Sequence, residues 1–180
     1  NIVDSAEVER FHDRYRSGSV KLETGLVNRK YADNLLIGIL ATGNDKEVQT
    51  GATMGKVYGG ITRNSQSLIP SLKYSKENLF TDGLNVSFYS AYNITKSEVI
   101  DTLSGVEYNW LGEITPDSKN GELARTYTTL NDDDFNSQLN VGYSISPKHA
   151  LALNYAYSYF KRKSFDKENP DKAVFTIYKT

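Results

Sequence analysis

Four aromatic residues in polar surroundings have the side chains best suited to contact a ligand: Tyr58, Tyr108, Trp110 and Tyr127. An aromatic ring with polar neighbours can stack on a sugar or on the planar ring of a chelate. The same rings could instead pack one loop against another, and the sequence leaves both interpretations open. These four residues are the candidates for ligand contact.

Motifs for phosphate or metal binding are incomplete. In Gly51–Lys56 three residues separate the glycines and Val57 follows the lysine, whereas a phosphate-binding loop has four residues there and then Ser or Thr. The run Asp132–Asp134 lacks the alternate acidic spacing and the glycine of a calcium-binding EF-hand, which favours a solvated loop. The two histidines, His12 and His149, are distant in sequence, and His149 falls in a predicted exposed turn. We expect no metal site and no cofactor.

Catalytic and modification motifs are incomplete as well. Ser144 follows Gly142 at the spacing of a nucleophile elbow, but the second glycine of that motif is absent. Asn85 and Asn93 begin glycosylation acceptor motifs, yet both lie inside a predicted strand, so we interpret them as coincidental. The protein is therefore predicted not to be an enzyme.

Composition excludes several classes of protein. The 180 residues include 21 basic and 22 acidic side chains, for a formal net charge of −1, which argues against nucleic-acid binding. The absence of cysteine excludes a disulfide scaffold and a thiolate metal site. No apolar run approaches the roughly 18 residues of a helical membrane span. The chain begins at Asn1 without a secretory signal, which suggests a processed chain or a fragment.

Apolar and polar residues alternate along most of the chain, and a period of two predicts strands with unlike faces. Pro70 cannot donate a ladder hydrogen bond, so we expect an interruption or a bulge there. A short helix from Asp4 to Arg14 and a seventh strand over Ala173–Lys179 are further expectations. The six main strands are predicted at Ser19–Leu26, Leu35–Thr42, Ser67–Ser75, Leu84–Asn93, Leu139–Ile145 and Leu151–Tyr159.

The connections between these strands alternate in length. Short turns are predicted near Asn28–Asn34, Lys76–Gly83 and Ser146–His149, whereas Gly43–Asn64 and Glu98–Asn136 are long and polar. The predicted fold is therefore all-β, an antiparallel up-and-down meander of about six to seven strands with long loops at one end. Long unstructured connections are uncommon in soluble domains, but outer-membrane barrels have them on one side.

The two-faced strands fit two environments. A soluble sheet buries its apolar face, whereas a barrel strand turns that face to lipid and its polar face to a wet lumen. The placement of tyrosines favours the bilayer: Tyr155, Tyr157 and Tyr159 follow one end of an apolar stretch, and Tyr74 and Tyr143 lie near the opposite ends. Both faces of Leu35–Thr42 are fairly apolar, so its orientation stays open.

The order of the segments resembles the barrel of a TonB-dependent outer-membrane receptor. The resemblance covers most of the chain and rests on the overall pattern of its segments, because no short motif defines a barrel. It is carried by Val8–Gly18, Leu35–Thr42 with Gln49–Met54, Ser67–Tyr74, Leu84–Asn93, Tyr108–Trp110 and Gln138–Lys163.

This resemblance implies that residues 1–180 are a single segment of a barrel of about 22 strands, without the plug domain of the family. It implies a bacterial outer-membrane location, contact with outer-membrane lipid, and energy-coupled uptake of a small nutrient such as a metal chelate, a vitamin or a glycan. The energy-transducing periplasmic partner would engage a part of the parent protein that is not present here. An isolated fragment would have to hide its apolar faces by collapse, strand exchange or oligomerisation. The alternative is a soluble all-β ligand-binding or adhesion module with long loops.

Overall fold

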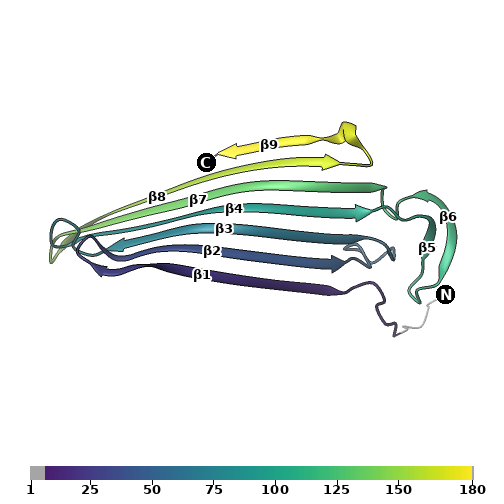
Figure 1. The fold of residues 1–180 in the computed structure, drawn as a ribbon, viewed down its shortest axis with the longest axis horizontal. Helices are drawn as coiled ribbons and strands as arrows, with labels where there is room; N and C mark the ends of the chain where they lie inside the picture. The colour runs from purple at the N-terminus through teal and green to yellow at the C-terminus, as the bar shows by residue number, and fades with distance from the viewer. Residues whose placement is uncertain (1–6, 180) are drawn as a thin grey trace.

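The computed structural model describes residues 7–179, and 71% of the chain is strand. Seven strands form one antiparallel sheet in the order β1-β2-β3-β4-β7-β8-β9, and β5 and β6 form a separate hairpin (Figure 1). This confirms the predicted all-β meander and its seventh strand. The elements are β1 (Tyr15–Arg29), β2 (Ala32–Glu47), β3 (Thr62–Lys76), β4 (Leu84–Asp101), β5 (Ser104–Tyr108), β6 (Ile114–Asn120), β7 (Thr126–Ser146), β8 (His149–Asp166), the 3-10 turn η1 (Pro170–Lys172) and β9 (Val174–Lys179).

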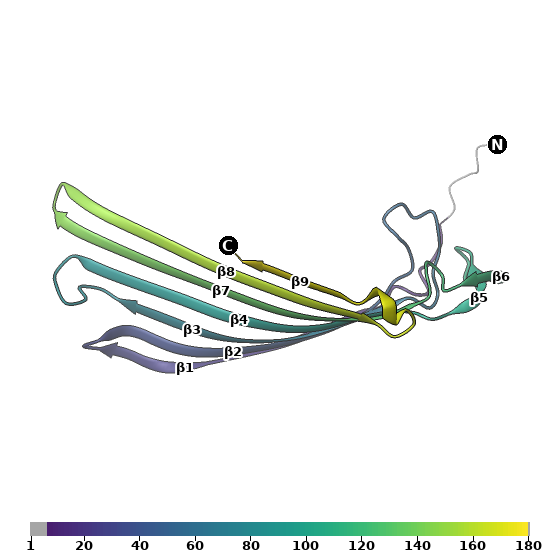
Figure 2. The same ribbon diagram turned by 90° about the horizontal axis from the view of Figure 1, so that it is seen from above.

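The sheet is a single curved layer, as the two views at right angles show (Figures 1 and 2). Each strand of the sheet pairs with its neighbour in the chain, except that the β5–β6 hairpin is inserted between β4 and β7 and lies beyond their ends. Most domains pack two layers around a core. Among the described residues no second layer covers either face of the large sheet.

The strands are longer than the periodicity predicts, and the two long loops are correspondingly shorter. The first five residues of the predicted loop Gly43–Asn64 belong to β2, and its last three belong to β3. The predicted loop Glu98–Asn136 likewise loses residues to β4 and β7 and contains the β5–β6 hairpin. These predictions were wrong because polar residues occupy both faces at the strand ends, which removes the alternation although the backbone ladder continues.

The acidic run Asp132–Asp134 shows the same effect. It was predicted as a solvated loop but lies in β7, where Arg162 of β8 donates to both carboxylate oxygens of Asp132 at 2.6–2.7 Å. Lys161 lies 3.9 Å from Asp133. Ion pairs of this kind can form between neighbouring strands of a sheet. Because the residues are charged, the sequence shows no alternation of apolar and polar residues there, although a strand is present.

Three further predictions concern local backbone structure: the N-terminal helix, the interruption at Pro70 and the turn at Gly83. Residues 7–14 contain no helix, and Asp4, the predicted first residue of one, lies outside the described residues. At Pro70 the pairing of β3 with β4 lapses between Leu68 and Ser71 without a change of register, so there is an interruption and no bulge. Gly83 has φ +82, a left-handed conformation that suits glycine, in the predicted turn between β3 and β4.

The register brings the apolar residues of six strands onto one face, here called the apolar face. Residues paired across strands share a face, and successive residues in a strand alternate between faces. This settles the orientation of Leu35–Thr42, because Leu35, Ile37 and Ile39 pair with the apolar positions of β1 and β3. The apolar face includes Val20, Leu22 and Leu26 of β1, Leu35, Ile37 and Ile39 of β2, Leu68, Leu72 and Tyr74 of β3, Val86, Phe88 and Ile94 of β4, Leu139, Val141 and Tyr143 of β7, and Leu151, Leu153 and Tyr155 of β8.

The apolar face is bare in this structure. Leu22 is 66% exposed, Ile37 63% and Leu153 60%, although each is in the middle of a paired strand region. The buried hydrophobic residues of the described chain are Ala32, Val57, Tyr58 and Ile61, which lie near the strand ends and in the loops. Monomeric soluble proteins rarely expose a contiguous apolar surface of this extent.

The opposite face, the polar face, carries ladders of hydrogen bonds and ions. Glu23 of β1 accepts Lys73 of β3 at 2.7 Å and lies 3.3 Å from Lys21. Between β3 and β4, Ser65 bonds Ser97 at 2.9 Å and Ser67 bonds Thr95 at 2.7 Å. Small and hydrogen-bonding side chains of this kind suit a surface that stays in water.

Candidate functional site

Two of the predicted ligand-contact residues are brought together beyond the strand ends, in a group of loops here called the loop cap (residues 48–61 and 102–125). Tyr58 is only 5% exposed. Tyr108 of β5 pairs with Val57 in an isolated bridge, and its ring fills the space beside Gly59. Its ring centroid lies 5.6 Å from that of Phe11. Tyr108 thus joins the β5–β6 hairpin to the loop between β2 and β3, whereas Tyr58 is buried within that loop, where its N–H donates to the Gln49 carbonyl oxygen at 2.7 Å.

The other two predicted residues lie apart from this pair. Trp110 sits half-buried in the turn between β5 and β6. Tyr127 was placed in a loop by the sequence, but the structure places it in β7, with Lys167 Nζ 3.7 Å from the centre of its ring. The structure of residues 7–179 therefore does not gather the four aromatic residues into one binding site.

Two carboxylates, which the sequence analysis did not single out, hold the loop cap. Asp101, at the end of β4, is 1% exposed and accepts the backbone N–H groups of Glu122, Leu123 and Ala124 at 2.7–3.1 Å. Glu122 in turn accepts the N–H groups of Gly59 and Gly60 at 2.6 and 2.8 Å. Because hydrogen bonds to ionised acceptors are strong, this chain fixes the segment after β6 to β4 and to the loop between β2 and β3.

The N-terminal part of the described chain is anchored to the same loops. The His12 N–H donates to Gln49 Oε1 at 3.0 Å, and His12 Nε2 lies 2.9 Å from the carbonyl oxygen of Ile61. Glu47 accepts the Arg14 guanidinium at 2.8 Å. Gln49 is buried, and its Nε2 has no hydrogen-bond partner among the described residues. These contacts link positions distant in sequence and leave no local pattern by which they could be found.

Asp166 fixes the segment that leads from β8 to β9. It accepts Thr126 Oγ1, the Tyr127 N–H, the Glu168 N–H and Asn169 Nδ2 at 2.7–3.0 Å. Burial opposes ionisation of this carboxyl, but the four donors outweigh burial and hold the pKa of Asp166 far below its ordinary value. A carboxyl with a depressed pKa stabilises the fold above its unfolded pKa, and this contribution fades as the pH falls below about 4.

We therefore expect Asp166→Asn to loosen this connection by about 1–3 kcal/mol at neutral pH, because one acceptor oxygen becomes a donor that faces other donors. Hydrogen exchange of residues 166–172 should rise in the variant at pH 7. The difference from wild type should shrink as the pH is lowered from about 4 toward 2, because the carboxyl then takes up a proton in the opened segment, where its pKa is ordinary. An equal difference at pH 7 and pH 2 would contradict the assigned role of the ionised form.

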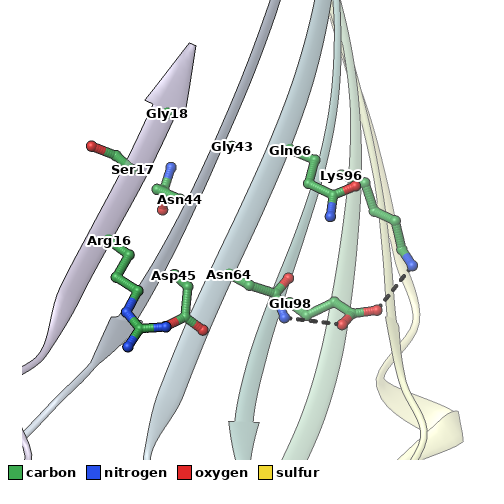
Figure 3. A pocket seen from close by; sticks show the side chains of 10 residues that line it. All are labelled: Arg16, Ser17, Gly18, Gly43, Asn44, Asp45, Asn64, Gln66, Lys96 and Glu98. Carbon is green, nitrogen blue, oxygen red and sulfur yellow. Dashed lines mark hydrogen bonds and ion pairs between the residues drawn. The ribbon is translucent and has the colours of Figure 1, made fainter.

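A hollow of about 490 Å³ lies on the sheet itself, at the loop end of the apolar face (Figure 3). Its floor contains Gly18 of β1 and Gly43 of β2, which pair directly with each other. Arg16, Asp45 and Gln66 stand around it, and the Lys96–Glu98 ion pair, at 2.9 Å, closes the side toward β4. We call this hollow the rim notch.

No family model, no curated protein and no solved structure matches this chain. No helix among residues 7–179 is long and apolar enough to cross a membrane. The same residues contain no group of three or more His, Asp or Glu side chains that could hold a metal ion. Function is therefore inferred from the geometry of the sheet, the loop cap and the rim notch.

Proposed function

We propose that this sheet is part of the wall of a transmembrane β-barrel, with the apolar face toward lipid and the polar face toward a water-filled interior. The observation that carries the proposal is the segregation of side chains by the register. Exposed aliphatic residues of six neighbouring strands form one continuous band, while the other face carries ions and hydroxyls around a smaller apolar group, Leu36, Leu40 and Ile69. Barrel strands have this arrangement, apolar outward and polar inward.

The height of the band supports a bilayer. On β4 it runs from Leu84 to Ile94, and on the same face Lys96 and Glu98 follow it. Ten residue steps of a strand span about 33 Å, or about 25 Å along the membrane normal at a tilt of about 40°, which equals the apolar band of such barrels. Tyr143 and Tyr159 lie near its two borders on β7 and β8, as interfacial residues do.

The border of the band is oblique, as strand tilt requires. On β1 to β4 the last apolar row contains Val20, Ala41, Leu68 and Ile94. The same row on β7 and β8 already contains the charged residues Asp133 and Lys161. Strands of a closed barrel tilt and stagger in this way, because closure imposes a shear on the register.

The parent function that we propose is an energy-coupled uptake receptor of the bacterial outer membrane, of the TonB-dependent type. Seven strands are fewer than the roughly eight of the smallest outer-membrane barrels, and β1 has no partner on its outer edge among the described residues. Further strands would thus complete the wall. The ordered loop cap lies at one end only, where a receptor would capture a small nutrient. Coupling to a periplasmic energy-transducing partner would use other parts of such a receptor.

The absence of cysteine allows a direct test of lipid contact. Single cysteines at each of residues 151–158 of β8 would carry nitroxide labels in the intact protein, reconstituted in liposomes. We expect collisions with oxygen, which partitions into lipid, to peak at positions 151, 153, 155 and 157. Collisions with a water-soluble nickel complex should peak at positions 152, 154, 156 and 158.

Protection of the odd-numbered positions from both reagents would contradict the proposal that the sheet is part of a barrel wall. That pattern would mean that a second protein layer covers the apolar face, as in a soluble all-β module. Uniform access of the nickel complex to all eight positions would also contradict this proposal.

A further inference from the structure

We propose that the polar face of the sheet binds a neutral oligosaccharide between two aromatic groups. One group is Tyr89 of β4, and the other is the stacked pair of Phe160 and Tyr178 on β8 and β9, here called the aromatic stack. The inference rests on the proposed function, because it takes the polar face as the wall of a water-filled interior. It names a substrate class and a site for the uptake proposed there.

The aromatic stack is exposed on a surface of hydrogen-bonding side chains. Phe160 and Tyr178 are register partners on neighbouring strands, with ring centroids 6.2 Å apart and an angle of 24° between the rings (Figure 1). Tyr178 is 64% exposed. The stack therefore has free ring surface for a ligand. Nearby side chains on the same face of β7 and β8 are those of Asn136, Gln138, Asn140, Asn154 and Ser158.

The position of the Phe160 ring is fixed by its surroundings. The Arg162 guanidinium lies 5.4 Å from the centre of this ring. Arg162 is itself held by Asp132, whose two carboxylate oxygens accept its hydrogen bonds at 2.6–2.7 Å. A ring that is already held in place loses little conformational freedom when a ligand packs on it.

A hollow of about 610 Å³, here called the inner hollow, adjoins the stack. Ser158, which lines it, is two residues from Phe160 on the same face of β8. Its far side is closed by Tyr89, which is 42% exposed and shares a register row with Ala156. Four residue steps of a strand separate that row from Phe160, or about 13 Å. This length suits a short oligosaccharide better than a single sugar ring.

The charges at the stack indicate a neutral ligand. Asp134 is the register partner of Phe160, and within residues 7–179 it forms no ion pair. One of its oxygens accepts Asn136 Nδ2 at 2.8 Å. Because Asp132 matches the charge of Arg162, one negative charge is left, which would repel an anion. Arg162 over the Phe160 ring disfavours a cation at that ring.

A sugar has the two chemical properties that this site can bind. Its C–H faces are apolar and can pack on an aromatic ring, as on Tyr178. Its hydroxyl groups can donate to the free oxygen of Asp134 and exchange hydrogen bonds with side-chain amides such as that of Gln138. A neutral oligosaccharide therefore fits both the aromatic residues and the charge of the site.

The rim notch does not offer this chemistry. It lies on the apolar face, and its opposite charges lie side by side, Arg16 beside Asp45 and Lys96 beside Glu98 (Figure 3). No aromatic residue lines it. Its charges thus balance each other and select no ligand.

The stack lies toward the loop end of the polar face. Asp133 and Lys161, which are adjacent in the chain to Asp134 and Phe160, are the charged residues at the border of the apolar band on β7 and β8. The inner hollow lies farther toward the turns. A ligand that entered from the loop cap would therefore reach the stack before the hollow.

The test is isothermal titration calorimetry of the intact, folded protein in a detergent without a sugar headgroup, because a glucoside or maltoside would compete. The neutral probes are trisaccharides of glucose, xylose, mannose and galactose. Trigalacturonate is the acidic counterpart of the galactose probe, and fully deacetylated chitotriose is a cationic probe. We expect a neutral trisaccharide to bind most tightly.

Three variants locate the binding. Tyr178→Ala should weaken binding of that trisaccharide about tenfold, through loss of the stacking surface. Asp134→Asn should also weaken it about tenfold and should narrow its advantage over trigalacturonate, because the repelling charge is removed. Phe175→Ala removes a ring of similar exposure on the opposite face of β9 and should leave binding unchanged.

Three results would overturn the inference. The first is that no neutral trisaccharide binds at about 10 mM, a concentration that detects even millimolar affinity. The second is that a charged probe binds most tightly. The third is an equal loss of binding in Tyr178→Ala and Phe175→Ala.

Failure here is distinguishable from failure of the barrel wall. If the spin labels on β8 show lipid contact with a period of two and no neutral trisaccharide binds, the wall stands and only the sugar site is lost. If the labels show no lipid contact while Tyr178→Ala weakens saccharide binding, the receptor is lost and the sugar site belongs to a soluble module.

Discussion

Leu139→Arg is expected to destabilise the membrane-embedded protein by about 2–4 kcal/mol, the cost of an arginine at the bilayer midplane on the lipid face of a barrel. Leu139 lies near the middle of the apolar band on β7, in one row with Phe88 and Tyr155. The measurement is reversible unfolding by guanidinium chloride in lipid vesicles, followed by tryptophan fluorescence of the intact protein.

Two substitutions in the same strand serve as controls. Gln138→Arg places the same side chain one residue away on the polar face, where Gln138 is exposed, and should cost less than about 1 kcal/mol. Asn131→Arg lies on the same face as Leu139 but beyond the band, and should also cost about 0–1 kcal/mol, as substitutions near the interface do. If all three variants unfolded at the same denaturant concentration, the assignment of the faces would be wrong.

Asp101→Ala is expected to release the loop cap from β4. The substitution leaves three backbone N–H groups without their acceptor, and water can replace it only in part because Asp101 is 1% exposed. A local loss of about 2–4 kcal/mol should follow, which corresponds to at least thirtyfold faster hydrogen exchange in residues 102–125. Exchange in the centres of β4 and β7 should stay at the wild-type rate.

Asp117→Ala provides the matched control, in the β5–β6 hairpin of the loop cap that Asp101 holds. Asp117 lies in β6 and pairs with Lys119 at 2.8 Å, in an ion pair whose lysine is half-exposed. Such surface pairs contribute about 0–1 kcal/mol, so exchange of the cap should change by less than about fivefold. Comparable exchange in the two variants would show that Asp101 stabilises the loop cap no more than a surface carboxylate does.

The central part of each strand could be predicted because one face is apolar there. Val20 and Leu22 alternate with Lys21 and Glu23, and the register pairs these two apolar residues with Ala41 and Ile39 on β2. The ends could not be predicted in this way: Asp45 pairs with Asn64, and Thr95 with Asp132, so that polar residues meet polar residues in the ladder. Backbone hydrogen bonds continue where the side-chain period has disappeared.

The sequence predicted the fold more closely than the positions of the four aromatic residues. Tyr58 is buried in the loop between β2 and β3, Tyr108 pairs with Val57 of that loop, and Tyr127 lies in a strand, while their contact with a ligand stays a prediction. The rim notch was missed because its two glycines are separated along the chain and become neighbours only in the register. A single glycine in a strand carries no information about which residue lies opposite.

The sequence by itself determined the strand type, the tight turns and the presence of two unlike faces, because a period of two is a local property of the chain. Only the tertiary structure decided which face Leu35–Thr42 presents, how far each strand extends, and which carboxylates hold the loop cap. These depend on the register between strands and on contacts such as that of Glu122 with Gly59. Such contacts join residues far apart in sequence, where composition and spacing carry no signal.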